Sequence, residues 1–459
     1  MRLDAVFLSR LQFAFTIAFH IVFPAFTIGL SAWIATLLVV WRRTGLERYR
    51  DLARFWTRIF AVSFAMGVVS GIVLSYEFGT NWSRFSLIVG NVVGPLIGYE
   101  VLTAFFLEAT FLGIMLFGWR RVPPGLHVLS AILVAVGTLF SAFWIIAANS
   151  WMQFPAGHVI RDGIAYPADW LSAVFSPTFP IRFAHMVSAA YLTTAFVVLA
   201  TGARYLVNGQ QPEHGRTMLK MGLGMAIVLA PLQLLIGDVH GLLAERVQPA
   251  KIAAVEAHWN GAEPGSFVFF AIPDEANEVN RYEIAIPGLG SLLITHSFTG
   301  LFPGLKDFAA VDRPPVAIPF FAFRLMVGLG LIMIAMAVWG TVQWWRGRLE
   351  ESRLFLRLAS WTWPIGFIAI ISGWTVAEVG RQPWVATGIL RTADAASPVA
   401  PSAVGATLIL FVIVYFAVFG TGIVYISRLI RKGPTPDQAP PEGVPNRPLT
   451  AYSGAAEEG

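Results

Sequence analysis

The chain has 459 residues, of which 56% are hydrophobic and only 13% are charged. The apolar residues gather in stretches of about twenty, the length that crosses the hydrocarbon layer of a membrane as a helix, which predicts an all-α polytopic membrane protein. The lack of cysteine excludes iron–sulfur clusters, thiolate-ligated haem, c-type haem attachment and disulfides. Any bound metal would therefore need His, Met or carboxylate ligands.

About nine stretches fit membrane-spanning helices, and we expect them to form one bundle. They lie near residues 11–41, 53–78, 92–117, 125–148, 181–206, 217–238, 319–345, 360–377 and 403–430. Several are interrupted by Gly or Pro, which membrane helices tolerate where neighbouring helices or a ligand satisfy the freed backbone groups. The interruptions favour a bundle around something buried. We expect no cleavable signal peptide before the first span.

Basic residues predict the orientation of the bundle. They lie in alternate connections and beside the last span, at Arg42, Arg43, Arg48, Arg50, Arg54, Arg58, Arg120, Arg121, Arg204, Arg216, Lys220, Arg346, Arg348, Arg353, Arg357, Arg428, Arg431 and Lys432. The positive-inside rule places these segments in the cytoplasm, with the N-terminus outside and the C-terminus inside. The same location argues against nucleic-acid binding as the reason for the net charge of +5.

This topology divides the chain into four regions. Residues 1–238 hold the first six predicted spans, residues 239–318 form an extracytoplasmic lobe, and residues 319–432 hold the last three spans. Residues 433–459 are rich in Pro, Gly and Glu without apolar periodicity, which predicts a disordered cytoplasmic tail. The lobe segment mixes charges with short apolar runs, so we expect it to be folded. The shorter outer connections are 79–91, 150–180 and 378–402.

Five side chains able to bind iron or carry protons fall in the outer half of the predicted bilayer, on five different spans. They are His20, Glu100, His185, Met326 and Glu378. Ionisable groups inside membranes mark functional sites when they pair, bind a metal or carry a proton. Pro24 cannot donate to the carbonyl of His20, so a bend that leaves room for a bulky group is expected there. Taken singly, His20 also fits a packing contact, His185 an interfacial residue and Met326 a gap-filling side chain.

Two further groups of residues indicate proton chemistry. Glu100 and Glu108 share one span about two helical turns apart, ~12 Å, and Ser141 on the next span is a further candidate for a proton relay. The alternative is that both carboxyl groups are protonated, hydrogen-bonded core groups. Glu378, Arg381 and two tryptophans lie in residues 373–384, where an ordinary interfacial anchor is the alternative.

The predicted lobe begins with titratable residues beside an apolar surface. Lys251, Glu256 and His258 suit a quinol whose hydroxyl protons leave with its electrons. In a helix, Lys251 and Glu256 would point about 140° apart, so their spacing alone does not make them a pair. The alternative is a solvated amphipathic helix. Near the seventh span, Arg324 lies close to Met326, where it could neutralise a haem propionate.

Together these segments resemble subunit I of the cytochrome bd quinol oxidases. The resemblance covers about the first 430 residues, in the order of the family. It rests on Ser9-Arg10-Leu11-Gln12-Phe13 with His20, Gly98-Tyr99-Glu100 with Glu108, Trp151-Met152-Gln153, His185, residues 237–259, Arg324-Leu325-Met326-Val327-Gly328 and residues 373–384.

The resemblance implies a set of haem ligands and site residues. His185 and Met326 would be the axial ligands of haem b558, with Arg324 beside it. His20 and Glu378 would bind the high-spin haems b595 and d, without deciding which residue binds which haem. The resemblance also implies roles for Glu100 in the dihaem pocket, Trp374 among the haems, Arg381 near propionates or the carboxylate, and Lys251 and Glu256 in quinol oxidation.

The implied activity is oxidation of ubiquinol or menaquinol at the outer face and reduction of dioxygen to water, with protons taken from the cytoplasm and no proton pump. The resemblance implies that the protein lies in the bacterial inner membrane, in contact with lipid, and that it has a homologous second subunit. It leaves open whether a small single-helix subunit is also present. In this family the extracytoplasmic quinol-oxidation loop, here residues 239–318, is called the Q-loop. The segment 259–319 is short, which resembles the short Q-loop group of the family that includes cyanide-insensitive oxidases. A third haem b in place of haem d is therefore an alternative. The rival functions are a proton-coupled secondary transporter and a haem-b quinol electron carrier without oxygen reduction.

Overall fold

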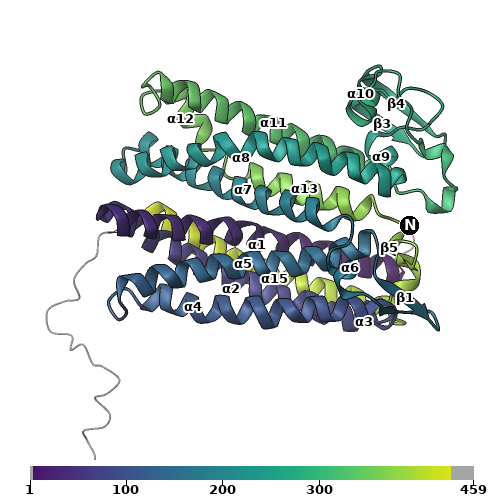
Figure 1. The fold of residues 1–459 in the computed structure, drawn as a ribbon, viewed down its shortest axis with the longest axis horizontal. Coiled ribbons are helices and arrows are strands. Elements are labelled where there is room, and N and C mark those ends of the chain that lie inside the picture. The colour runs from purple at the N-terminus through teal and green to yellow at the C-terminus, as the bar shows by residue number, and fades with distance from the viewer. Residues whose placement is uncertain (1–3, 436–459) are drawn as a thin grey trace, which may run out of the picture.

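The computed structural model describes residues 4–435. Long helices run side by side along one direction, and a lobe lies at one end of the bundle (Figure 1). The helices are α1 (Ala5–Thr44), α2 (Glu47–Thr80), α3 (Ser83–Glu100), α4 (Phe106–Phe117), α5 (Pro124–Gln153), α6 (Trp170–Val174), α7 (Phe179–Val207), α8 (Pro212–Val247), α9 (Pro249–Glu256), α10 (Leu289–Thr295), α11 (Ala317–Trp345), α12 (Arg353–Ala359), α13 (Ile365–Val379), α14 (Thr392–Ala395) and α15 (Pro401–Lys432).

Three antiparallel hairpins and three short turns complete the described chain. The hairpins pair β1 (His158–Arg161) with β2 (Ile164–Pro167), β3 (Phe267–Asp274) with β4 (Val279–Ile286), and β5 (Trp384–Ala386) with β6 (Leu390–Arg391). The turns are the π-helical η1 (Val101–Phe105) and the 3₁₀ turns η2 (Leu305–Asp307) and η3 (Ala310–Asp312). All three hairpins lie outside the long helices, so the prediction of an all-α membrane bundle is confirmed for the part that crosses the membrane.

Eight helices in the described residues are long and apolar enough to span a membrane, counting α3, η1 and α4 as one. The ninth predicted span, 360–377, corresponds to α13, which is apolar but has only 15 residues. At 1.5 Å per residue it is ~22 Å long, against ~30 Å of hydrocarbon. Pro364 immediately precedes it, and Gly380 follows its last residue. The count of nine spans therefore stays a prediction.

One predicted connection is wrong, and one helix extends past its predicted span. The connection expected at 79–91 is only two residues long, because α2 ends at Thr80 and α3 begins at Ser83. Helix α8 extends past 238, the predicted end of the sixth span, and continues to Val247 through a polar stretch that contacts protein at the lobe end. Hydropathy locates the edge of the hydrocarbon layer, whereas a helix continues for as long as its backbone bonds are satisfied.

Close helix packing holds the bundle together. Helix α7 runs antiparallel to α8, and at Gly202 an added Cβ would lie 2.6 Å from the backbone nitrogen of Leu219. Small residues at such crossings let membrane helices approach closely. Helix α1 is largely enclosed, with Trp33 and Leu37 in the core, and it continues through Pro24 as one helix. The bundle thus surrounds the helix that carries His20.

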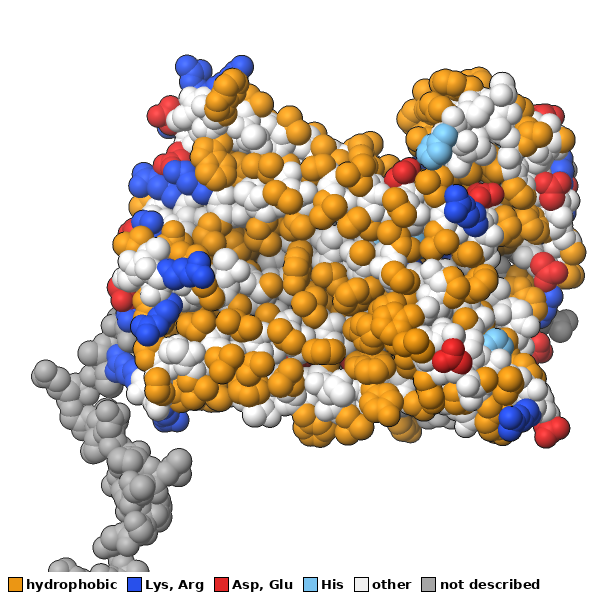
Figure 2. Space-filling view, in the orientation of Figure 1, with side chains coloured by type: hydrophobic (Ala, Val, Ile, Leu, Met, Phe, Trp, Pro, Cys, Tyr) orange, Lys and Arg blue, Asp and Glu red, His pale blue; other side chains and the backbone are white. Residues whose placement is uncertain are grey.

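The two ends of the molecule differ in charge. Lys and Arg side chains gather at the end of the bundle away from the lobe, and the middle of the visible face is mostly hydrophobic (Figure 2). The lobe comprises α9, β3, β4 and α10 and packs on the start of α11 (Figure 1). The predicted tail at 433–459 lies outside the described residues except for 433–435.

Candidate functional site

A cavity of about 1560 Å³ lies within the bundle, where α1, α2, α3, α5 and α13 meet. Most of its lining is apolar, and its polar lining residues include Arg10, His20, Glu100, Glu108, Ser141, Asn149, Glu378 and Arg381. Its volume exceeds the ~300–1,000 Å³ usual for one small-molecule site. Trp374 also lines it and packs against Ile21 and Ile370. Seven of the predicted site residues, from five segments of the sequence, therefore share one cavity.

His20 is oriented by α2. Its Nδ1 lies 2.9 Å from Oγ of Ser70, and that hydroxyl also lies within 3.0 Å of the carbonyl oxygens of Met66 and Gly67. If the hydroxyl donates to a carbonyl, Nδ1–H donates to the hydroxyl, and Nε2 keeps a free lone pair. Metal-binding histidines are commonly held this way. Gly71 makes room for the ring, because a Cβ there would lie 3.2 Å from Cε1 of His20.

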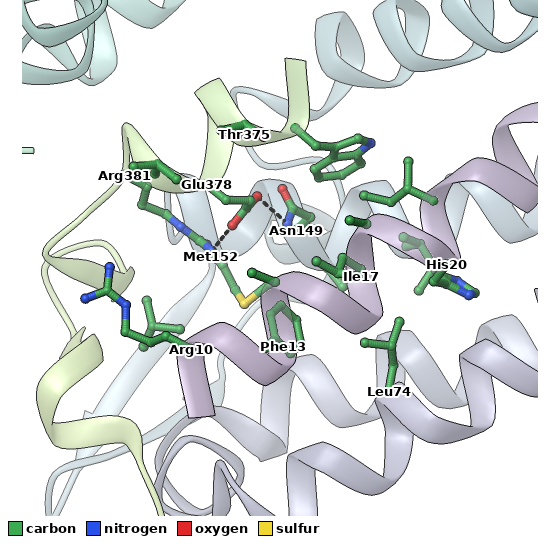
Figure 3. A pocket seen from close by; sticks show the side chains of 18 of the residues that line it. Arg10, Phe13, Ile17, His20, Leu74, Asn149, Met152, Thr375, Glu378 and Arg381 are labelled. Carbon is green, nitrogen blue, oxygen red and sulfur yellow. Dashed lines mark hydrogen bonds and ion pairs between the residues drawn. The ribbon is translucent and has the colours of Figure 1, made fainter. Parts of the chain in front are cut away.

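Glu378, one residue before the end of α13, lies among polar partners (Figure 3). One carboxylate oxygen accepts from Nδ2 of Asn149 at 2.9 Å and from Nε2 of Gln153 at 3.3 Å. The other accepts from Arg381, and Arg182 donates to the amide oxygen of Asn149. The carboxylate is therefore fixed in orientation before any ligand binds.

The same cluster holds more positive charge than negative charge. Nε and Nη1 of Arg381 and Nε of Arg182 are buried without a hydrogen-bond partner in the described structure. Buried guanidinium donors are costly unless an anion or acceptor meets them. A group with carboxylate substituents, such as the propionates of a haem, would satisfy these donors.

Glu100 and Glu108 reach the same cavity because of the π turn between them. In an ideal α-helix, side chains eight residues apart lie about 80° apart around the axis, and a π turn removes roughly 90° of rotation. The two carboxyl groups therefore share one face. Oγ of Ser141 donates to Oε1 of Glu100 at 2.8 Å, while Oε1 of Glu108 is buried and has no hydrogen-bond partner among residues 4–435. Ser141 thus contacts Glu100 alone.

His185 and Met326 lie in a separate region between α7, α8, α11 and α13 and do not line the cavity. Nε2 of Gln233 lies 3.3 Å from both ring nitrogens of His185. The ring centroids of His185 and His240 are 5.4 Å apart. A Cβ at Gly373 would lie 3.0 Å from Sδ of Met326. Glycine therefore keeps the surroundings of this sulfur open.

The lobe residues predicted to oxidise quinol are both buried but are not paired with each other. Lys251 donates to the amide oxygens of Gln153 and Gln248, each at 2.6 Å. Burial lowers the pKa of Lys251 well below its ordinary value, and Arg182 lowers it further. Glu256 forms an ion pair with Arg324 at 2.8 Å. Burial also lowers the pKa of His258 in the same lobe.

Arg324 is held by groups of the lobe, and its expected role beside a propionate stays a prediction. Nε donates to the carbonyl of Val268 at 2.9 Å, Nη1 donates to the carbonyl of Val255, and Nη2 binds Glu256. All three nitrogen atoms therefore contact the lobe. The sequence could not reveal this, because Glu256 lies 68 positions away.

The sequence interpretation missed several residues of the site. They are Ser70, Asn149, Gln153, Arg182, Gln233 and His240. Arg182 lies one helical turn before the predicted His185, so helical spacing offered a signal for it. Gln153 and His240 stand in segments that carry the family resemblance, although no role was predicted for them. Ser70, Asn149 and Gln233 carry no charge and are unremarkable in sequence.

These features define a multi-pass membrane protein whose bundle encloses ligand-type side chains, carboxyl groups and buried cations. The sequence profile described as "Cytochrome bd terminal oxidase subunit I" matches residues 8–434. The chain belongs to this family, as the resemblance predicted.

Individual relatives agree with this family. The chain is 32% identical to cytochrome bd-II ubiquinol oxidase subunit 1 of Escherichia coli (strain K12), covering 95% of this chain and 98% of that one. It is 34% identical to cytochrome bd ubiquinol oxidase subunit 1 of Bacillus subtilis (strain 168), covering 93% of each. The solved structure of bd oxidase from Geobacillus thermodenitrificans matches with a TM-score of 0.86 and 31% identity, over 94% of this chain and 99% of that chain.

Proposed function

We propose that this chain is the quinol-oxidising, haem-binding subunit of a terminal respiratory oxidase that reduces dioxygen to water. It is a multi-pass protein of the inner membrane and acts with a second oxidase subunit, as its family implies. The observation that carries the proposal is the single apolar cavity shared by His20, Glu378, Glu100 and Glu108. Bound haem supplies the redox chemistry, and the protein supplies position, electrostatics and proton access.

The residues of the cavity fit high-spin haems. The ring of His20 is oriented by Ser70, and Glu378 is held by three neighbours, so each is suited to one axial position. The unpartnered nitrogens of Arg381 and Arg182 are suited to propionates. We assign haems b595 and d to this cavity, with a third haem b as the alternative to haem d. Which haem binds His20 and which binds Glu378 stays open.

The second region fits a six-coordinate haem. A His and Met ligand pair favours electron transfer over ligand binding, and we assign His185 and Met326 to haem b558. Gly373 and Gly237 leave space beside the two side chains. This region adjoins α8 and α11, the helices that carry the lobe, which suits the first acceptor of electrons from quinol.

Lys251 and Glu256 would handle the protons of the quinol. The lowered pKa of Lys251 favours a neutral amine able to accept a proton, and Glu256 stays paired with Arg324. The substrate is ubiquinol or menaquinol. The short segment 259–319 supports a short Q-loop here.

Glu108, Ser141 and Glu100 would carry protons towards the cavity from the basic end of the bundle. The gathering of Lys and Arg at that end supports a cytoplasmic location for it, with the N-terminus and the lobe outside (Figure 2). Release of quinol protons outside and uptake of protons inside would separate charge without a pump. Each charge moved against 100 mV stores about 2.3 kcal/mol.

One experiment tests the proposed function directly. The chain would be purified with its second subunit, and a reduced-minus-oxidised optical spectrum and oxygen uptake with a short-chain quinol would be recorded. We expect haem bands and quinol-dependent uptake. Absence of haem would favour the transporter, and haem without oxygen uptake would favour the electron carrier. Pyridine haemochrome analysis then distinguishes haem d from a third haem b, and the subunit content of the preparation shows whether a small single-helix subunit is present.

A further inference from the structure

Gln153, the last residue of α5, contacts two charged side chains from distant parts of the sequence. It is completely buried, at 0% exposure. Its Oε1 accepts from Nζ of Lys251 at 2.6 Å, and its Nε2 donates to Oε1 of Glu378 at 3.3 Å and to the carbonyl of Ala377 at 3.2 Å. A single amide therefore lies between the quinol-oxidation lobe and the cavity.

The chemistry of these two neighbours fixes the amide in one orientation. Nζ of Lys251 is a donor, so it must face the amide oxygen, and the carboxylate of Glu378 is an acceptor, so it must face the amide NH₂. The reverse orientation would place donor against donor and acceptor against acceptor. Because the amide group is planar, a displacement of Lys251 changes the position of the NH₂ group that binds Glu378.

Neighbouring residues make only one of the two contacts. Gln248 accepts from Lys251 at 2.6 Å and donates to the backbone carbonyl of Gln153 at 2.9 Å, but it forms no hydrogen bond with Glu378. Asn149 donates to Glu378 at 2.9 Å and accepts from Arg182, but it forms no hydrogen bond with Lys251. Among the described residues, only Gln153 is hydrogen-bonded to both Lys251 and Glu378.

We infer that Gln153 is a positioning residue that couples the quinol-oxidation lobe to the haem carried by Glu378. The inference rests on the proposed function. In it, Gln153 holds Lys251 in place for quinol and at the same time donates a hydrogen bond to a carboxylate ligand. Loss of a donor makes a carboxylate more electron-rich, which stabilises oxidised iron and lowers the reduction potential of that haem.

The test compares three variants of the purified complex. Gln153→Met keeps the size of the side chain and removes both contacts, Gln248→Met removes a contact to Lys251, and Asn149→Leu removes a contact to Glu378. The readouts are KM for a short-chain quinol and the haem potentials from spectroelectrochemical titration. We expect Gln248→Met to raise KM only and Asn149→Leu to lower a high-spin potential only. Gln153→Met is expected to do both, with about a tenfold change in each equilibrium, which for one electron is ~59 mV.

A second variant covers the case in which Gln153→Met fails to assemble. Gln153→Glu keeps an acceptor for Lys251 but places a second carboxylate against Glu378. We expect a KM close to that of the unaltered protein and a lowered high-spin potential. A raised KM with an unchanged potential would overturn the coupling.

The outcomes for this inference and for the proposed function are distinct. An unaltered complex without haem bands or quinol-dependent oxygen uptake removes the proposed function. An active, haem-loaded complex in which Gln153→Met changes only one readout, or neither, removes the coupling role of Gln153 and leaves the proposed function standing.

Discussion

The buried ion pair between Glu256 and Arg324 shows how single residues join the lobe to the bundle. Both side chains are largely buried, and Arg324 also binds the carbonyl oxygens of Val255 and Val268. One guanidinium therefore ties the end of α9 and strand β3 to α11, two residues before Met326. Breaking a buried pair is costly because the remaining charge loses its partner.

Replacing Glu256 with Gln should slow quinol oxidation without loss of haem. The substitution keeps the shape and removes the charge that Arg324 binds, and charged hydrogen bonds contribute about 1.5–3 kcal/mol, roughly 10- to 100-fold in kcat/KM for quinol. Oxygen uptake with a short-chain quinol measures the change, and the haem spectrum serves as the internal reference. Glu283→Gln, at an exposed position of the same lobe, is the matched control. Unchanged turnover in Glu256→Gln would remove its proposed role.

The π turn η1 lies between Glu100 and Glu108, the two carboxyl groups proposed to carry protons. It holds one residue more than an α-helix would place between Glu100 and Glu108, and this extra residue brings the two carboxyl groups to one face. Turns of this kind absorb a single residue locally, so the helices on either side keep their direction.

Changes of length within η1 should therefore have unequal effects. Deleting Leu102, whose side chain is 65% exposed, restores an ordinary helix with the carboxyl groups seven residues apart and still on one face. We expect turnover within about threefold of the unaltered protein. Inserting one Ala after Val101 rotates Glu100 by about 100°, and we expect at least a tenfold loss of oxygen uptake. Equal losses in the two variants would contradict this role of the turn.

The β3–β4 hairpin of the lobe depends on an aspartate at its turn. Asp274 accepts from the backbone nitrogen of Asn277 at 3.1 Å and from its Nδ2 at 2.8 Å, and Arg281 binds it at 2.7 Å. These contacts lower the pKa of Asp274 from 3.8 to about 2, with Asn277 the largest cause. The folded state therefore releases this proton more readily than the unfolded chain does.

The sign of this pKa shift predicts how the hairpin responds to acid. Its stabilising contribution is complete above the unfolded value of 3.8 and is lost as the pH falls through about 2. We expect amide hydrogen exchange in β3 and β4, corrected for intrinsic rates, to speed up over that interval. Asp274→Asn should remove the pH dependence. An equal pH dependence in this variant would show that other groups cause it.

The whole molecule is polar at both ends and apolar between them. The basic end lies opposite the lobe (Figures 1 and 2), and the lining of the cavity includes Glu275 and Arg313 near the lobe. If the lobe is outside, the proposed release of quinol protons takes place on that side, and the proposed uptake through Glu108 starts from the other side. The direction of charge separation therefore depends on orientation.

The lack of native cysteine makes this orientation measurable. Arg161→Cys, on the exposed hairpin at the lobe end, should react with a membrane-impermeant maleimide added to intact spheroplasts. Asn208→Cys, in the exposed turn between α7 and α8, should react only after lysis. Labelling is read from the gel band of this chain, with the unaltered protein as the blank. The opposite pattern would reverse the proposed direction of proton movement.

The sequence by itself determined the membrane bundle, the positions of most spans and the small set of ionisable residues inside them. These features are local, because about twenty apolar residues must lie in hydrocarbon and charges there are rare. The family resemblance added roles for His20, His185, Met326 and Glu378, and these roles stay predictions.

Only the tertiary structure decided which of these residues meet and what holds them. Three contacts join positions that lie 50 or more residues apart in the sequence. They are the hydrogen bonds of Gln153 to Lys251 and Glu378, the ion pair of Arg324 with Glu256, and the contact of His20 with Ser70. The π turn and the extension of α8 are likewise absent from the hydropathy pattern. The polar contacts have one physical cause. Buried polar groups must find hydrogen-bond partners, and neighbours in space rather than in sequence supply them.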